Sequence, residues 1–204
     1  MTAHRAFPAD GFAARWATHD GDHVESLSLT WENEGWTAVG AVGREDVQYV
    51  LRVTAQWKVS QFLLFRDLDE ADLWLGTDSQ GRWGEVNGAH RTDLDGGTDI
   101  ALAITPFTHT LPIRRLPLGV GNGAELSVLH VDVETLGVVP RTVVYERLAE
   151  RRWRHEFDGE GVEFEVDEYG LALEIPGRFR RLSGESDGDQ DDGDQDDGRQ
   201  SVSR

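Results

Sequence analysis

The fold is decided by residues 47–57, which read VQYVLRVTAQW. Apolar side chains occupy every second position from Val47 to Trp57, and mostly polar ones lie between them. Because successive side chains of a β-strand point to opposite faces, this period of two predicts a strand with one buried and one solvated face. The same alternation recurs over residues 26–31 and 162–167. Burial on one side is typical of antiparallel sheets, so the sequence predicts a mainly antiparallel fold.

Short clusters of Gly, Asn and Asp separate the alternating stretches and predict hairpin turns, for example at residues 32–35, 78–81 and 158–161. About ten to twelve candidate strands lie between such turns. A sheet of that size must curl into a barrel or a deeply curved sheet. We therefore expect an all-β fold, or a β-rich one with one or two short helices.

The charge of the chain excludes several classes of partner. It has 38 Asp and Glu against 20 Lys and Arg, a formal net charge of −18. Nucleic acids are not expected as partners, because proteins bind the phosphate backbone through Lys and Arg. No apolar run approaches the ~20 residues of a membrane span, and no export signal is visible, so we expect a cytoplasmic protein without integral membrane association.

The charged residues are also unevenly divided among the amino-acid types. Lys58 is the only lysine, and Asp is more frequent than Glu. Our hypothesis is a halophilic adaptation to a salt-rich cytoplasm, where screening removes repulsion within an acidic fold. Residues 183–204 repeat DGDQD and contain almost nothing apolar, which predicts a disordered, acidic, low-complexity tail. Residues 1–182 are predicted to form a single barrel-like domain.

No pattern for catalysis or metal binding stands out. The chain has no cysteine, which excludes disulfides and thiolate metal sites, and its seven histidines show no metal-ligand spacing. Acid and base pairs cannot be picked out among 38 carboxylates. We therefore name no catalytic residue, no metal and no cofactor, and we expect a binding protein rather than an enzyme.

Seven tryptophans are many for this length, and most fall on or beside predicted strands. Core packing explains most of them. Some could instead line the inside of a curved sheet that is too wide to fill itself, because a barrel of about ten strands leaves room for a ligand. Trp31 and Trp57 are our candidates for such a lining.

The alternation breaks at residues 105–116, which read TPFTHTLPIRRL. With Pro117 just beyond, this segment cannot be an ordinary central strand. We expect a structured loop in which Pro106 and Pro112 hold the chain extended, with one helical turn at residues 113–116.

Together with GTDI at residues 97–100, this segment resembles the hallmark of the "Putative glycolipid-binding" family, whose members typically read TPFTNTLPIRRL. His109 stands where Asn is usual, and Gly97 where Cys is common. The resemblance extends over most of residues 1–182 and also takes in Trp16, Glu25, Tyr49, Arg52, Trp57, residues 73–83, Tyr145, Trp153 and residues 167–171. It implies an antiparallel sheet curved into an unclosed barrel, similar to bacterial lipoprotein carriers, which hold acyl chains against the concave face.

The resemblance further implies binding of a glycolipid or another amphiphile in the concavity; the oligomeric state stays open. In this interpretation Phe107 meets an acyl chain, while Arg114 and Arg115 offer forked donors to a phosphate, a carboxylate or sugar hydroxyls. The full set of candidate ligand-binding residues is Phe107, Thr108, His109, Thr110, Arg114, Arg115, Trp57 and Trp31.

A structural role for the same segment is favoured over ligand binding, because a buried loop must first satisfy its own backbone groups. The segment would then act as a plug of the barrel. Two other functions also stay open. One is an enzyme that acts on a small amphiphilic or sugar substrate with His109 as the base, and the other is a protein interaction module.

Overall fold

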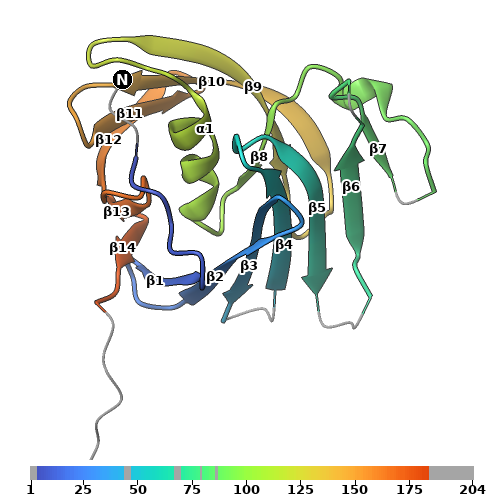
Figure 1. Cartoon of the computed structure of the whole chain (residues 1–204), viewed down its shortest axis with the longest axis horizontal. Coiled ribbons are helices and arrows are strands. Elements are labelled where there is room, and N and C mark those ends of the chain that lie inside the picture. Colours follow the sequence, from blue (N-terminus) through green and yellow to red (C-terminus); the bar gives the residue numbers. More distant parts are fainter. Residues whose placement is uncertain (1–3, 44–46, 67–69, 79, 86, 184–204) are drawn as a thin grey trace, which may run out of the picture.

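The computed structural model describes residues 4–43, 47–66, 70–78, 80–85 and 87–183. The tail predicted for residues 183–204 falls, apart from Ser183, outside the described residues. One short helix and a single large sheet make up the fold (Figure 1). The strands are β1 (Phe12–Thr18), β2 (Val24–Glu32), β3 (Gly35–Val42), β4 (Val47–Thr54), β5 (Val59–Arg66), β6 (Leu73–Thr77), β7 (Trp83–Glu85), β8 (Asp99–Leu102), β9 (Gly123–Val131), β10 (Val138–Arg147), β11 (Arg152–Phe157), β12 (Glu160–Val166), β13 (Ala172–Ile175) and β14 (Phe179–Arg181).

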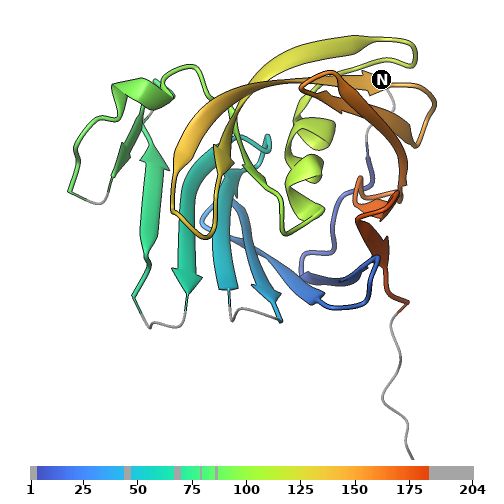
Figure 2. The same ribbon diagram turned by 180° about the vertical axis from the view of Figure 1, so that it is seen from behind.

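The sheet runs in the order β7-β6-β5-β4-β3-β2-β1-β14-β13-β12-β11-β10-β9-β8. All neighbours pair antiparallel except β8 and β9, which are parallel. The sheet curls around α1 (Thr110–Arg115) without closing, and β7 and β8 are its two ends (Figures 1 and 2). The predicted all-β class and the unclosed, curved antiparallel sheet are confirmed.

In the described part of the chain the sheet has fourteen strands, not the ten to twelve predicted. The two that the sequence did not reveal are β1 and β14, which pair with each other and so join the two halves of the sheet. β1 reads FAARWAT, in which small and charged residues weaken the alternation, and β14 has only three residues. Both depend on tertiary pairing more than on local propensity.

The concave face of the sheet is apolar and buried because the apolar side chains of neighbouring strands lie opposite one another. Leu29, Ala38, Leu51, Phe62 and Leu75 lie opposite one another in turn across β2 to β6, and each is at most 1% exposed. They belong to the larger of two hydrophobic clusters. The smaller cluster lies between α1 and strands β9 to β14. The core therefore has two halves, with the helical segment between them.

Side chains, not a strand ladder, hold the two ends of the sheet near each other. Arg66 of β5 donates to the carbonyl oxygens of Val133 (3.2 Å) and Glu134 (2.7 Å), just beyond β9. The indole Nε1 of Trp83 in β7 donates to the carbonyl oxygen of Gly97, two residues before the start of β8, at 2.9 Å.

The proline-rich segment folds differently from the prediction. Pro106 adopts helical backbone angles before the 3-10 turn Phe107–His109, and Pro112 lies within α1, so the expected extended conformation is wrong at both prolines. Proline is tolerated there because the first turn of a helix leaves its N–H groups unpaired. The helix begins at Thr110, three residues earlier than predicted, and ends at Arg115, because Leu116 precedes Pro117 and is extended. No helix in the described ranges is long and apolar enough to cross a membrane.

Candidate functional site

The segment of residues 105–116 lies inside the curved sheet and is largely buried. Phe107 and Leu111 are both 0% exposed and pack in the larger hydrophobic cluster. The Phe107 ring stacks on Tyr49 of β4 with 6.4 Å between ring centroids. Thr110 is equally buried and donates to the carbonyl oxygen of Gly170 at 3.2 Å. Phe107 and Thr110 are therefore core residues in this structure.

A buried carboxylate anchors the start of this segment. Glu25 of β2 accepts hydrogen bonds on Oε1 from Tyr49 (2.5 Å) and from Thr105 (2.6 Å), and its Oε2 is buried without a partner in the described structure. Thr105 Oγ1 in turn accepts from the backbone N–H of Phe107 at 2.9 Å. Burial raises the pKa of Glu25 from 4.5 to about 7, against the opposing effect of the two hydroxyl donors. Glu25 is thus close to its protonation midpoint at neutral pH.

A cavity of about 180 Å³ lies between the helical segment and strands β8 to β11. Its walls are mostly apolar, with Ala101, Leu102, Pro112 and Val143 among the lining residues. Thr108 and His109, two of the residues predicted from the sequence, also line it. This is the part of the candidate site where the helical segment leaves space beside the sheet.

Three polar aromatic groups meet in this cavity. The Nδ1 atom of His109 lies 2.6 Å from Oη of Tyr145, and the ring of His155 is 4.9 Å from each of the other two rings. Burial lowers the pKa of His109 well below its usual value and that of His155 to about 4. Burial also raises the pKa of Tyr145. At neutral pH the cluster therefore offers uncharged hydrogen-bonding groups.

Positive charge flanks the cavity. Arg141 and Arg178 both line it and both are exposed. Arg178 donates to the carbonyl oxygen of Ala103 at 3.0 Å, and among the described residues neither arginine forms an ion pair. The cavity thus combines apolar walls, a neutral polar cluster and two guanidinium groups that form no ion pair with a described residue. No group of three His, Asp or Glu side chains in the described ranges is placed to hold a metal ion.

The structure puts the other predicted residues elsewhere. The guanidinium of Arg114 lies between the rings of Phe7 and Trp57, 4.6 and 4.5 Å from their centroids, and donates to the carbonyl oxygens of Arg5 and Tyr169. Burial lowers the pKa of Arg114 to about 10. Arg114 and Trp57 thus contact each other inside an aromatic cluster, away from the residues that line the cavity.

Arg115 and Trp31 are separate from both. Arg115 forms an ion pair with Asp99, which is 1% exposed, and also donates to Thr98 Oγ1 at 3.2 Å. Asp99 lines the cavity, whereas Arg115 lines a groove on the other side of this pair. Trp31 is 42% exposed and contacts Trp36 edge to face.

Sequence reasoning did not predict Tyr145, His155, Arg141 or Arg178 as binding residues, and Tyr145 was named only as part of the family resemblance. A usable signal was present for the first three. Arg141, Val143 and Tyr145 occupy every second position of β10, and register pairs Tyr145 with His155 of β11, so all of them share one face. Arg178 reaches the cavity from the turn between β13 and β14, and no local pattern in the sequence places it there.

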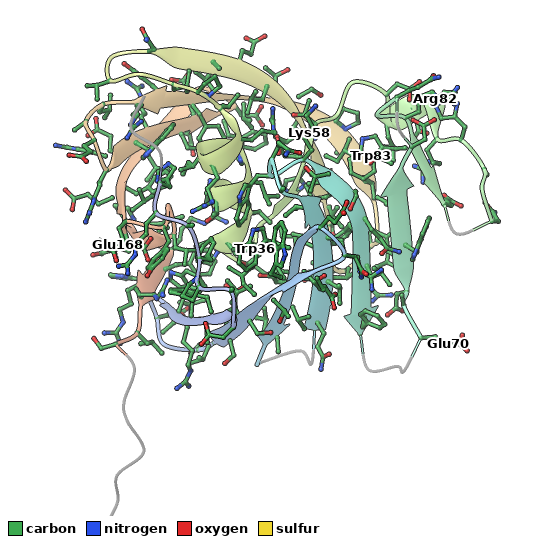
Figure 3. All side chains as sticks on the ribbon, in the orientation of Figure 1. Trp36, Lys58, Glu70, Arg82, Trp83 and Glu168 are labelled. Carbon is green, nitrogen blue, oxygen red and sulfur yellow. The ribbon has the colours of Figure 1, made fainter. Side chains whose placement is uncertain are left out.

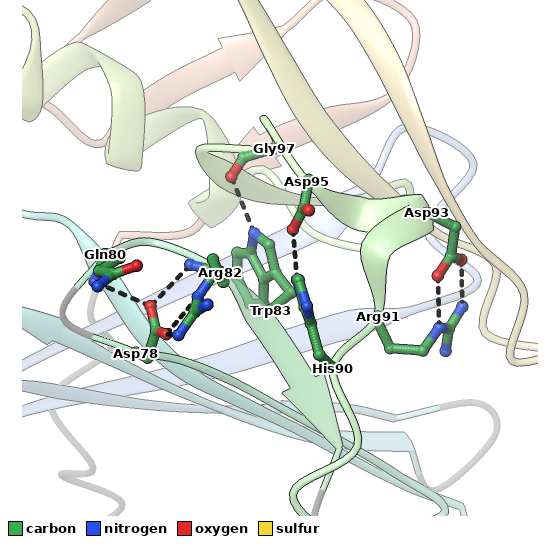
Figure 4. Close-up of polar contacts among 9 residues, drawn as sticks. All are labelled: Asp78, Gln80, Arg82, Trp83, His90, Arg91, Asp93, Asp95 and Gly97. Carbon is green, nitrogen blue, oxygen red and sulfur yellow. Dashed lines mark hydrogen bonds and ion pairs between the residues drawn. The ribbon is translucent and has the colours of Figure 1, made fainter.

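A second hollow surrounds the β6–β7 hairpin. Two grooves, of about 550 and 730 Å³, lie there and share Ser60, Thr77, Asp78 and Trp83. Two polar contacts frame them: the ion pair of Arg82 with Asp78 at 2.6 Å and the hydrogen bond of His90 with Asp95 at 2.9 Å (Figure 4). Trp83 is held between them by its bond to Gly97 (Figure 4), and Lys58 and Arg82 lie near it in Figure 3.

Comparison with known proteins identifies the family. The family model described as "Putative glycolipid-binding" matches residues 13–181, so the chain belongs to this family. The crystal structure of a DUF1089 family protein from Pseudomonas aeruginosa is similar, with a TM-score of 0.63 and 27% sequence identity over 87% of this chain and 95% of that one. No curated protein matches the chain. The resemblance inferred from residues 97–116 is thus confirmed.

Proposed function

We propose that the protein binds a glycolipid or another amphiphile, with an apolar chain in the 180 Å³ cavity beside α1. The observation that supports this most strongly is the meeting of apolar walls with the His109, His155 and Tyr145 cluster in one cavity. Ligand sites for small molecules typically have this composition, with few polar groups among many apolar ones. The family description points to the same class of ligand.

The cavity limits what can bind. A volume of 180 Å³ is below the ~300 Å³ of most ligand sites, so it suits a short chain or the end of a longer one. The neutral imidazoles and the phenol can exchange hydrogen bonds with hydroxyl groups, and Arg141 and Arg178 can contact a more polar part at the exposed edge. Each buried methylene contributes about 0.8 kcal/mol, so affinity should rise about fourfold per methylene until the cavity is full.

The enzyme alternative receives less support. It requires a histidine with a shifted pKa beside a carboxylate that orients it. The shifted histidine is present, but the Nδ1 of His109 contacts the phenol of Tyr145. An interaction module would be favoured by a large exposed apolar patch. The large exposed apolar residues of the described chain belong to different elements: Trp31, Val39, Val120, Val139 and Leu173.

Replacing Ala101 by leucine should weaken amphiphile binding at least tenfold without unfolding the protein. Ala101 lines the cavity and is only partly buried, so the larger side chain can occupy the empty volume. We expect calorimetric titration with hexyl β-glucoside to detect binding to the wild type and a loss of at least tenfold in Ala101→Leu, because the chain no longer finds apolar space.

Ala41→Leu is the matched control, because Ala41 of β3 is exposed and lies outside the lining of the cavity. It should bind as the wild type does. Equal affinity of all three proteins for the glucoside, with unchanged melting temperatures, would contradict the proposed function.

A further inference from the structure

The outer face of strands β4 to β7 carries the 550 Å³ groove. Register places Arg52 opposite Gln61, Gln61 opposite Gly76, and Gly76 opposite Gly84. The residues next to this row that face the core, Leu51, Phe62 and Leu75, are all 0% exposed. Because side chains alternate between the two faces of a strand, this row lies on the side opposite the core.

Trp74 forms an aromatic wall of the groove. It is half-buried, and its six-membered ring rests on Gly76, because a Cβ atom at that position would lie 2.9 Å from Cη2 of Trp74. Gly84 on the neighbouring strand also lacks a side chain, and the carbonyl oxygen of Ala89 lies 3.1 Å from where its Cβ atom would be. A pyranose ring suits such a platform, because its C–H face is apolar while its hydroxyls need hydrogen-bond partners.

Two cations remain without partners along the grooves. Arg52 lines the first groove and Lys58 lines the second, and both are exposed. Among the described residues no ion pair engages either side chain, whereas the other charged groups here are paired, such as Glu85 with Arg91 at 2.8 Å. In a chain of net charge −18, two free cations beside an aromatic platform favour an anionic ligand.

We propose that the grooves around the β6–β7 hairpin bind an acidic saccharide, with a sugar ring on Trp74 and its anionic group facing Arg52 and Lys58. Gln61 can donate to and accept from sugar hydroxyls, whereas the hydroxyl groups of Ser60 and Thr77 already donate to backbone carbonyl oxygens and can accept from the sugar. This site goes beyond the proposed function, because it needs no apolar chain and shares no lining residue with the 180 Å³ cavity. Either site can therefore fail without the other.

The test is an NMR titration of the full chain with trigalacturonate, and with maltotriose as the neutral trisaccharide. We expect trigalacturonate to shift the indole N–H of Trp74 and the backbone amides of Gly76 and Gly84. Maltotriose should shift the same signals with at least tenfold lower affinity, because it lacks the group that Arg52 and Lys58 hold.

Single substitutions show which side chains contact the trisaccharides. Trp74→Leu should weaken both trisaccharides about tenfold through loss of the platform, and Lys58→Gln should weaken trigalacturonate alone by a similar factor. Arg180→Gln removes one exposed positive charge from β14, outside the residues that line the grooves, and should change nothing. Co-sedimentation with phosphatidylcholine vesicles that contain sulfatide then distinguishes a lipid-borne sugar, which carries the protein down, from a free saccharide, which does not.

Three results would overturn the proposal: no shift at Trp74 with trigalacturonate, equal affinity for both trisaccharides, or an equal loss in Arg180→Gln and Lys58→Gln. Ala101→Leu should leave trisaccharide binding intact. A loss of hexyl glucoside binding in that variant, with trisaccharide binding retained, separates the two sites experimentally.

Discussion

Phe107→Ala should lower the free energy of unfolding by about 4 kcal/mol. Phe107 is 0% exposed, stacks on Tyr49 and belongs to the larger hydrophobic cluster, so its truncation opens a cavity in the middle of the core. The two halves of the core would lose the ring that fixes the helical segment on β4. Urea denaturation monitored by tryptophan fluorescence measures the difference.

Leu173→Ala is the control for this change, because Leu173 of β13 is 40% exposed. It should cost less than about 1 kcal/mol. Similar losses in the two variants would show that Phe107 is no more important to the fold than a surface residue, and would contradict a structural role of the segment inside the sheet.

As the pH rises, the free energy of unfolding of Glu25→Gln should increase relative to that of the wild type. The folded protein raises the pKa of Glu25 from 4.5 to about 7, so folding favours the protonated acid. The stabilisation by this group is complete below about pH 4.5 and is lost as the pH rises through 7. The difference between the pKa values corresponds to about 3 kcal/mol, an order-of-magnitude figure. Glutamine can still accept from Tyr49 and Thr105 but carries no charge.

Denaturation of both proteins at acidic and at mildly alkaline pH measures this double difference. The comparison with Glu25→Gln is needed because His4 and His155 act in the opposite sense. Burial lowers the pKa of each to about 4, so their contribution to stability is lost as the pH falls. A difference between wild type and Glu25→Gln that does not change with pH would show that Glu25 is not titrating near neutrality.

Local sequence patterns predicted most of the strands, because a strand with one buried and one solvated face shows alternating apolar and polar residues. The residues of β4 show this most clearly: Val47, Tyr49, Leu51 and Val53 are all buried. The same logic missed β14, whose three residues gain their conformation from pairing with β1 and β13. The prolines were predicted wrongly, since Pro106 precedes a 3-10 turn with helical backbone angles and Pro112 lies in the first turn of α1, so neither extends the chain.

The candidate site was predictable only in part. A motif placed Thr108 and His109 in a chemically distinctive segment, and both line the cavity. It could not show that Arg114 turns toward Phe7 and Trp57, because that direction depends on the packing of residues far apart in the sequence. The salt-rich cytoplasm inferred from the acidic composition stays a prediction.

The central claim is that an apolar chain enters the cavity beside α1. It is tested most directly by isotope-filtered NMR on the protein with hexyl β-glucoside labelled in its alkyl chain. We predict nuclear Overhauser contacts from the terminal methyl group to Val143 and Tyr145, both of which line the cavity. Contacts only to residues outside the cavity, or the same contacts in Ala101→Leu, would contradict the account.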